Sequence, residues 1–465
     1  MSGPPAAVRD WLAANRPRLL DELLAFLAIP SVSTAPAHAP DIRAAAALLQ
    51  ARLARIGLHG VRLLDGGGHP AVYGEYLGAP GQPTILVYGH YDVQPPEPLE
   101  LWDSPPFTPS IREGRIHARG ASDDKSPLWI ALSAIEAWLA CTGGLPVNVR
   151  ILLEGEEEVG SATLPAIMTA HRDLLAADVL VSADGGRWRP GLNTTNTNSR
   201  GLAAVEVTVR TAARDLHSGR FGGPVGNAPM ALARLLATLH DEAGRIAVPG
   251  FFDGLRRPGN ADYASMQALG FDEAAFFRDI GARPGAQEPG VGLLESLWFR
   301  PTLEVNGIAG GYDGPGVKTV IPCTARAKLT CRLGPGQDPA RVVAAVAAHL
   351  RAHCPSWVDL EVAEAADGTP AYAVPENDPY LAIVEQVIAD IHGSRPLRVG
   401  IGGTLPISAM AKTLLGLETV MLSYAIADEQ IHAPNEFFRL SSFDEGLAAW
   451  ASFLPALRRP GKSGN

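Results

Sequence analysis

The chain has 465 residues, of which 46% are hydrophobic and 19% are charged. This balance is typical of a folded globular enzyme rather than a disordered chain, and the length predicts two domains, because one core rarely grows beyond about 250–300 residues. The 39 Lys and Arg residues are outnumbered by 49 Asp and Glu residues, which gives a net charge of −10. Since no basic run offers a track for phosphates, we expect no nucleic-acid partner.

The N-terminal segment and the cysteines bear on the cellular compartment. The first residues contain no basic start followed by an apolar stretch, so we expect no signal peptide. No run approaches the ~20 apolar residues of a membrane span, so we expect no membrane partner. The cysteines form no CxxC pair, which predicts reduced thiols and a cytoplasmic location. The cysteines are Cys141, Cys323, Cys331 and Cys354.

The first part of the chain alternates helices with short apolar strands. Apolar residues recur at helical spacing from Trp11 to Leu27, and Pro30 ends this predicted helix. A second helix is predicted from Asp41, a good N-cap residue, to Ile56. Strands are predicted at residues 71–76, 84–88, 147–153 and 179–182, with a helix at 127–139. This alternation predicts an α/β fold with a mixed, largely parallel sheet flanked by helices.

From Gly201 the pattern changes to that of a second domain. Its predicted order is strand, helix, two strands, helix and strand, the split βαβ pattern of a small α+β sheet. These elements are predicted at residues 202–210, 229–239, 302–305, 325–333, 339–352 and 358–363. A polar insertion at residues 244–299 shows no clear periodicity. Helix and strand patterns resume at residues 379–391, 418–423 and 443–454. We therefore expect a first domain of residues 1–200 and 368–465, interrupted by an inserted domain of residues 201–367.

Acidic and histidine residues follow several predicted strands, which is where ligands bind in open α/β sheets. The segment TILVYGHYDVQ places His90 and Asp92 directly after a strand. The neutral imidazole of His90 is a good metal ligand. Asp92 points the same way along an extended chain, so it could accept the other ring N–H of His90. The alternative is a His–Asp pair at the surface.

Two further motifs carry neighbouring carboxylates. In HARGASDDKS, Asp123 and Asp124 precede a predicted helix, where either they cap the helix or one of them binds a metal ion. In ILLEGEEEVGS, Glu157 and Glu158 belong to a group of four glutamates after a buried strand. This group is either a solvated acidic loop or a site with divided roles. In such a site, one carboxylate binds metal and its neighbour takes a proton from metal-bound water.

Asp184 in VLVSADGG and His432 in IHAPNE complete the pattern, although each by itself is equally an ordinary turn or surface residue. We expect all of these residues to lie at the same edge of the sheet, and all of them carry imidazole or carboxylate groups. Imidazole and carboxylate ligands suit Zn²⁺, Mn²⁺ or Co²⁺ rather than metals that prefer thiolates. Two histidines and three carboxylates can hold two ions about 3.5–4 Å apart if one carboxylate bridges them.

Taken in order, these motifs resemble the M20 metallopeptidase family, and within it the carnosine dipeptidase-like branch. The motifs extend from IPSVS at residue 29 to residue 436. They are GHYDVQ, ARGASDDK, EGEEEVGS, VSADGG, DLHSG, KTVIP, GGTLP and HAPNE. The resemblance implies an enzyme that hydrolyses dipeptides or short peptides with a water bridging two divalent metal ions. Zn²⁺ is the expected ion, with Mn²⁺ and Co²⁺ as alternatives.

The resemblance also implies which residues bind the ions. His90 and Asp184 would hold one ion. Glu158 and His432 would hold the other, and Asp123, followed by a cis peptide bond, would bridge the two. This assignment makes the first domain the catalytic one.

Further roles follow from the same resemblance. Glu157 would be the general base and then the acid, and Asp92 would orient His90. The inserted domain would be a lid that also forms a homodimer, with His217 of DLHSG reaching the partner subunit's active site to stabilise the oxyanion. Arg332 would bind the substrate carboxylate, as a bidentate guanidinium does well. The residues that match substrate-binding positions are His217, Thr319, Arg332, Gly403 and Thr404.

The sequence departs from the family pattern at two places that bear on substrate preference. Gly400 and Ile401 stand where close relatives often carry an arginine, and Arg398 is out of register. Ser126 replaces a usual glycine. These departures leave the metal ligands intact. One alternative function is an N-acyl amino acid amidohydrolase of the deacylase or desuccinylase kind. The other is a non-catalytic binding protein on the same scaffold.

Overall fold

The structure is a computed structural model that describes residues 3–285, 288–364 and 368–459. The chain forms two compact units. Unit 1 comprises Met1–Thr197, Val374–Val399 and Pro406–Asn465, and unit 2 comprises Asn198–Ala373 and Gly400–Leu405. Residue 367, where we expect the inserted domain to end, lies outside the described residues. The boundaries of a catalytic domain and an inserted lid therefore stay predictions.

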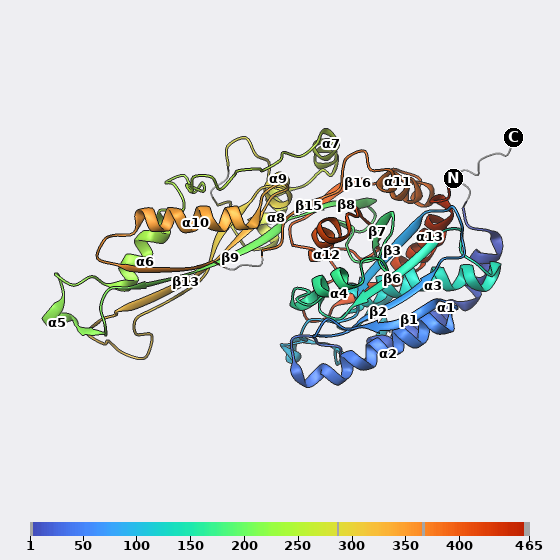
Figure 1. Cartoon of the computed structure of the whole chain (residues 1–465), viewed down its shortest axis with the longest axis horizontal. Coiled ribbons are helices and arrows are strands. Elements are labelled where there is room, and N and C mark those ends of the chain that lie inside the picture. Colours follow the sequence, from blue (N-terminus) through green and yellow to red (C-terminus); the bar gives the residue numbers. More distant parts are fainter. Residues whose placement is uncertain (1–2, 286–287, 365–367, 460–465) are drawn as a thin grey trace. The chain divides into compact units, whose positions relative to one another are not determined.

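Unit 1 contains a six-stranded mixed sheet (Figure 1). In sheet order its strands are β1 (His59–Leu64), β2 (Ala71–Tyr76), β6 (Asn148–Glu154), β3 (Thr84–His90), β7 (Val179–Ser182) and β17 (Thr419–Met421). The strands from β6 to β17 are parallel, and β2 and β1 are added antiparallel. This confirms the predicted mixed, largely parallel sheet. The sequence does not predict β1, because most of its side chains are exposed and show no apolar alternation.

Helices pack against both faces of this sheet. They are α1 (Ala6–Leu27), α2 (Ala39–Arg55), α3 (Ser126–Thr142), α4 (Leu164–Ala170), α11 (Pro379–His392), α12 (Pro406–Met410) and α13 (Leu440–Ala456). On one face, Leu86 and Tyr88 of β3 share an apolar core with Ile167 of α4. On the other face, Gly89 lies against Leu128 of α3. Helix α3 is buried over most of its length and contacts α1 and α13.

A small antiparallel sheet in unit 1 brings a late loop to the start of α3. Its order is β18 (Phe437–Arg439), β5 (Arg115–His117) and β4 (Ser110–Arg112). The pairing continues beyond the strands, since the backbone N–H of Ala118 donates to the carbonyl of Glu436 at 3.2 Å. Residues 118–125 therefore lie beside the segment that precedes β18.

Two further small sheets contain short strands. One has the order β15 (Tyr372–Ala373), β8 (Thr194–Ser199) and β16 (Leu397–Ile401), and the other pairs β10 (Leu216–His217) with β12 (Val320–Ile321).

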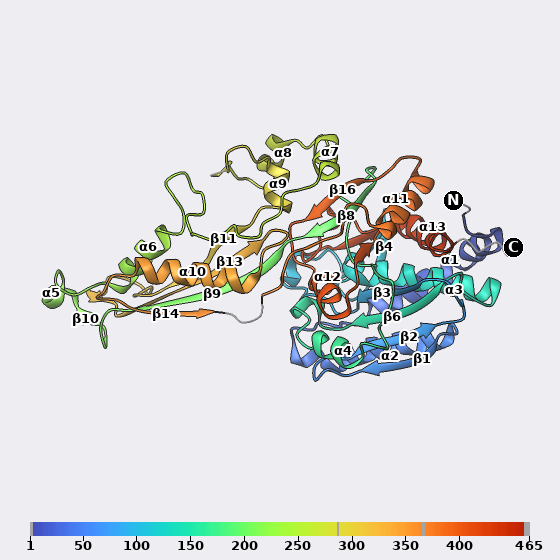
Figure 2. The same cartoon turned by 45° about the horizontal axis from the view of Figure 1, so that its top comes forward.

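Unit 2 is built on a four-stranded antiparallel sheet (Figure 2). In sheet order its strands are β11 (Thr302–Ala309), β13 (Thr324–Leu333), β9 (Gly201–Arg210) and β14 (Asp359–Glu364). Alternate residues such as Val205, Val207 and Val209 face helices α6 (Ala228–Ala237) and α10 (Pro339–His353) in one core. Each predicted strand and helix of the split βαβ pattern is present.

In the described part of the insertion, whose structure the sequence pattern does not predict, the chain forms three helices. They are α7 (Asn260–Ala268), α8 (Glu273–Asp279) and α9 (Leu293–Trp298), and a one-turn helix, α5 (Ser218–Phe221), precedes α6. These helices are short, so their apolar spacing is too brief to read from sequence. Among the described residues, no helix is both long and apolar enough to cross a bilayer.

The start of α2 corrects one local prediction. The helix begins at Ala39 rather than after Asp41. Asp41 thus lies in the first turn, where its carboxylate is 2.8 Å from Nδ1 of His38. A short turn over Pro36–His38 leads directly into the helix. His38 therefore occupies the N-cap position that the sequence predicts for Asp41.

Candidate metal centre

His90 ends β3 and is fully buried at the carboxyl edge of the main sheet. Its Nε2 lies 2.9 Å from Oδ1 of Asp123. Its Nδ1 lies 3.1 Å from the backbone carbonyl of Asp92 and 3.4 Å from the Asp92 carboxylate. The carboxylate of Asp92 also accepts the backbone N–H groups of Glu157, at 3.2 Å, and Glu158, at 3.1 Å. Asp92 therefore contacts both the His90 ring and the loop that carries the two glutamates.

Asp123 lies between two histidines. It belongs to the turn Ala121–Lys125 before α3, and the peptide bond between Asp123 and Asp124 is cis, as the family resemblance implies. Besides the contact with His90, Oδ2 of Asp123 lies 2.9 Å from Nε2 of His432. Burial raises the pKa of the Asp123 carboxyl, but the hydrogen bonds from His432 and His90 outweigh it and hold the pKa below the usual range.

Asp124 takes a different position from its neighbour. It is buried, and its carboxylate accepts the backbone N–H of His90 at 3.2 Å. Burial raises its pKa well above the usual range, with the charge of Asp184 as a further cause. The structure thus separates the two adjacent aspartates: Asp123 faces the histidine side chains, and Asp124 supports the end of β3.

The glutamates after β6 lie in the turn Glu157–Val159. A carboxylate oxygen of Glu158 lies 3.2 Å from Nε2 of His432 and accepts a hydrogen bond from Nε2 of Gln94 at 2.8 Å. Burial raises the pKa of Glu157 well above its usual range; His90 opposes this rise, whereas the charges of Asp184, Asp123 and Glu158 add to it. Glu157 is therefore a carboxyl that readily holds a proton.

Asp184 and His432 complete the cluster from two other segments. Asp184 follows β7, and burial together with the charge of Asp123 raises its pKa to about 7. His432 lies in the loop before β18 and is half exposed, and its hydrogen bonds to Asp123 and Glu158 raise its pKa to about 10. The Asp184 shift therefore comes mainly from burial, whereas the His432 shift comes from its two carboxylate partners.

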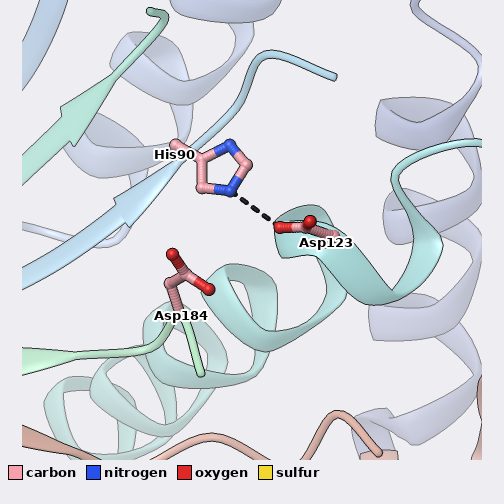
Figure 3. A group of neighbouring side chains, drawn as sticks. All are labelled: His90, Asp123 and Asp184. Carbon is pink, nitrogen blue, oxygen red and sulfur yellow. Dashed lines mark hydrogen bonds and ion pairs between the residues drawn. The ribbon is translucent and has the colours of Figure 1, made fainter. Parts of the chain in front are cut away.

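The structure brings the five predicted donors into two groups that have the spacing of metal ligands. One group is His90, Asp123 and Asp184, shown in Figure 3, and the other is Asp123, Glu158 and His432. Within each group the ligand atoms lie within 4.8 Å of one another. Because Asp123 belongs to both groups, one carboxylate can serve two ions. Imidazole nitrogen with carboxylate oxygen is a donor set that fits divalent ions such as Zn²⁺.

The remaining predicted residues belong to unit 2. Nη1 of Arg332 in β13 donates to the hydroxyl of Thr404 at 2.9 Å. Thr404 follows the Gly-Gly pair, whose first carbonyl, that of Gly402, accepts a hydrogen bond from Nε of Arg200 at 2.8 Å. Arg332, Gly403 and Thr404 thus belong to one local group.

The other two unit 2 candidates, His217 and Thr319, lie on neighbouring segments. The backbone N–H of Ser218 donates to the carbonyl of Thr319 at 3.1 Å. His217 is exposed and caps α5, where its Nδ1 accepts the backbone N–H of Gly219 at 3.0 Å. The side chain therefore stands at the beginning of a one-turn helix with its other ring nitrogen directed away from this cap.

The structure adds residues that the sequence reasoning did not single out. Gln94 binds Glu158, and Glu436 binds the turn that carries Asp123. Gln94 is the last residue of GHYDVQ, and Glu436 is the last residue of HAPNE. Their positions in these motifs are the sequence feature from which both could be predicted. Arg398, which is out of register with the family arginine, pairs with Glu385 at 2.7 Å.

Comparison with known proteins places the chain in a family. A model of peptidase family M20/M25/M40 matches residues 86–456. The chain is 29% identical to Beta-Ala-His dipeptidase of Rattus norvegicus, covering 97% of this chain and 92% of the relative. It is 27% identical to Cys-Gly metallodipeptidase DUG1 of Candida albicans, covering 96% of each.

A solved structure agrees with this placement. The M20 family metallo-carboxypeptidase Sso-CP2 from Sulfolobus solfataricus is 30% identical, with a TM-score of 0.84 over 94% of this chain and 99% of that one. The family match covers most of the chain, including the segments that supply all five predicted metal ligands. The chain therefore belongs to peptidase family M20/M25/M40.

Proposed function

We propose that this protein is a metal-dependent peptidase that hydrolyses dipeptides or short peptides, with Glu157 as the general base. The observation that carries this proposal is the position of Asp123, whose two oxygens each lie 2.9 Å from a histidine nitrogen. The dipeptidases among the relatives, which match the chain over nearly its whole length, support the same activity.

Two divalent ions would be held by the five donors. His90 and Asp184 would bind one ion, Glu158 and His432 would bind the other, and Asp123 would contact both. We propose Zn²⁺, with Mn²⁺ or Co²⁺ as substitutes, because these ions accept mixed imidazole and carboxylate ligands. When bound, such ions activate a water molecule and polarise the scissile carbonyl.

The proton transfers would fall to Glu157. Its carboxylate takes a proton from the attacking water and then delivers it to the leaving amine. Burial favours the neutral form of Glu157, which is the form that donates a proton in the second step. Asp92 would fix the orientation of His90 and also the backbone of Glu157, since it contacts both.

Unit 2 would bind the substrate and complete the site in a homodimer. Arg332, which donates to Thr404, would pair with the substrate carboxylate, and Thr319, Gly403 and Thr404 would also bind the substrate. His217 would stabilise the oxyanion in the partner subunit. We further propose a cytoplasmic location, because Cys141, Cys323, Cys331 and Cys354 are all free thiols.

A panel of dipeptides tests the substrate class. The metal-loaded protein should cleave dipeptides with a free amino end, and a chelator should abolish the activity until Zn²⁺, Mn²⁺ or Co²⁺ is restored. N-acetyl and N-succinyl amino acids serve as the comparison, because an amidohydrolase would prefer them. A protein that binds two ions per chain and cleaves none of the dipeptides would contradict the proposal.

A further inference from the structure

The loop that carries His432 has a backbone that its own sequence does not favour. Gln430, His432 and Asn435 all have positive φ angles, of 55°, 60° and 64°. Residues other than glycine adopt this left-handed region rarely, and they stay there only where surrounding contacts enforce it. The contacts that hold this loop therefore bear directly on where the His432 ring lies.

Glu436, just after this loop, is a buried carboxylate that makes several of these contacts. It is 1% exposed. Its Oε1 accepts the backbone N–H groups of Ser122, at 2.8 Å, and Asp123, at 3.1 Å. Its Oε2 accepts the backbone N–H of Gly120 at 2.8 Å and Nη1 of Arg119 at 2.8 Å. One carboxylate thus accepts four hydrogen bonds from residues 119–123, two of them from the backbone of Ser122 and Asp123.

Glu429 makes a second connection between the same two segments, from the other side of His432. Its Oε2 accepts the hydroxyl of Ser122 at 2.6 Å and the backbone N–H of Ile426 at 3.0 Å. Its Oε1 lies 3.0 Å from Nη1 of Arg439. The loop is therefore fixed to the turn before Asp123 both ahead of His432 and behind it.

We propose that Glu436 is a positioning residue for the metal centre, which sets the separation between Asp123 and His432. Glu436 is not proposed to contact the substrate or the reacting atoms. It binds the backbone of residues 120–123, and it lies only four residues after His432, so it connects the Asp123 turn to the His432 loop. The inference rests on the proposed function, because Asp123 and His432 are there assigned to the same ion. Arg119 is its counter-ion.

Replacing Glu436 by glutamine should disturb this arrangement without changing the side-chain volume. A carboxylate accepts with both oxygens, whereas an amide has one oxygen and one NH₂ group. In either orientation the NH₂ group would face N–H donors that now point at a carboxylate oxygen. The turn should therefore shift, and Asp123 with it.

The test is metal affinity rather than activity alone. The Zn²⁺-loaded full chain is titrated with a competing chelator, and the Zn²⁺ that remains bound is measured by elemental analysis. For Glu436→Gln we expect Zn²⁺ to be held more weakly, with a Kd that rises about 10–100-fold, the usual effect of losing a partner that orients a ligand. Excess Zn²⁺ should restore part of kcat, with KM little changed.

Glu385→Gln is the matched control. Glu385 is also a buried carboxylate in unit 1, bound to Arg398 at 2.7 Å, but it belongs to α11. Losing this pair should lower the melting temperature and leave both Kd values for Zn²⁺ unchanged. If Glu436→Gln does not fold, Glu436→Asp keeps the charge opposite Arg119 with a shorter reach and should weaken Zn²⁺ binding in the same way.

Two results separate failure of this inference from failure of the proposed function. A folded Glu436→Gln or Glu436→Asp protein that holds both ions as tightly as the unaltered protein overturns the positioning role alone. An unaltered protein that holds fewer than two Zn²⁺ ions at saturation overturns the proposed metal centre, and this inference with it.

Discussion

Asp123 and Asp124 are chemically identical neighbours, yet their environments differ. Asp123 has its two oxygens on His90 and His432. Asp124 points to the backbone of β3 and is enclosed there, so burial raises its pKa. Sequence reasoning from the residues left open which of the two would bind metal, because both precede the same helix. In the structure Asp123 is the one that faces the histidine side chains, which supports it as the ligand proposed above.

Substitutions of Asp123 and His432 should differ in how many ions they affect. Asp123→Ala removes a donor common to both ligand groups, so we expect weaker binding of both ions. His432→Ala removes a donor from one group only and should leave one ion bound with nearly unchanged affinity. Metal content after dialysis against a weak chelator measures this difference. Equal loss of both ions in the two variants would argue against Asp123 as the shared ligand.

Glu157→Gln should separate metal binding from turnover. The amide cannot take a proton from water, and general bases typically contribute about 10²–10⁴-fold to the rate. We expect kcat to fall by at least about 100-fold while two ions stay bound, since Glu157 belongs to neither ligand group. Kinetics and elemental analysis on the same sample test this. An active, metal-loaded variant would reject Glu157 as the base.

At the scale of elements, the buried helix α3 contacts α1 and α13 in the core of unit 1. Trp129 stacks on Phe26 of α1 with ring centroids 5.5 Å apart, and the Arg52 guanidinium lies 3.3 Å from its ring centroid. Its indole N–H donates to the carbonyl of Leu19 at 2.9 Å. The apolar length of α3 made this helix predictable. Its contacts with α1 and α2 could not be read from the sequence.

Trp129→Ala should destabilise unit 1 strongly. Truncating a fully enclosed tryptophan leaves a cavity and typically costs about 3–5 kcal/mol in the free energy of unfolding. Urea unfolding followed by circular dichroism measures the change. Trp357→Ala is the control, because Trp357 is 49% exposed and its loss should cost far less. If both variants lost a similar free energy of unfolding, the contacts of Trp129 in α3 would not be the main source of stability in unit 1.

Glu429, which connects two segments of unit 1, should make stability depend on pH. Burial raises its pKa to about 7, although the Ser122 hydroxyl, the backbone of Ile426 and Arg439 favour the ionised form. Below about pH 4.5 the carboxyl is protonated in both the folded and unfolded states. As the pH rises from there to about 7, only the unfolded chain releases the proton, so the folded state loses stability.

The measurement is the melting temperature across this range for the unaltered protein and for Glu429→Gln. Relative to the variant, the unaltered protein should lose at most about 3 kcal/mol between pH 4.5 and pH 7, with no further loss above. Because the comparison is a difference between two proteins, other titrating groups largely cancel. Parallel melting curves over the whole range would show that Glu429 keeps its ordinary pKa in the folded protein.

At the scale of the whole molecule, the functional candidates are divided between the two units. All five proposed metal ligands belong to unit 1, and the proposed substrate-binding residues belong to unit 2. Family membership, which the match over residues 86–456 establishes, confirms the resemblance read from the motifs. The proposed function assigns the chemistry to unit 1 and substrate recognition to unit 2.

His217→Ala tests whether unit 2 contributes to turnover. Loss of an oxyanion donor typically lowers kcat about 10²–10³-fold, and metal content should not change, since His217 is in unit 2 and the ligand groups are in unit 1. Arg234→Ala, at an exposed position of α6, is the control and should keep full activity. An unaltered kcat for His217→Ala would reject the oxyanion role.

The sequence by itself determined the elements with strong local signals and the family. The apolar runs of β2, β3, β6 and β7 and the motifs around His90, Glu157 and His432 needed only neighbouring residues to be recognised. Tertiary structure decided what depends on residues far apart in the chain. The contact of Asp123 with His432 and the hydrogen bonds of Glu436 to residues 119–123 are examples. Such contacts are set by packing between segments some 310 residues apart, which no local periodicity records.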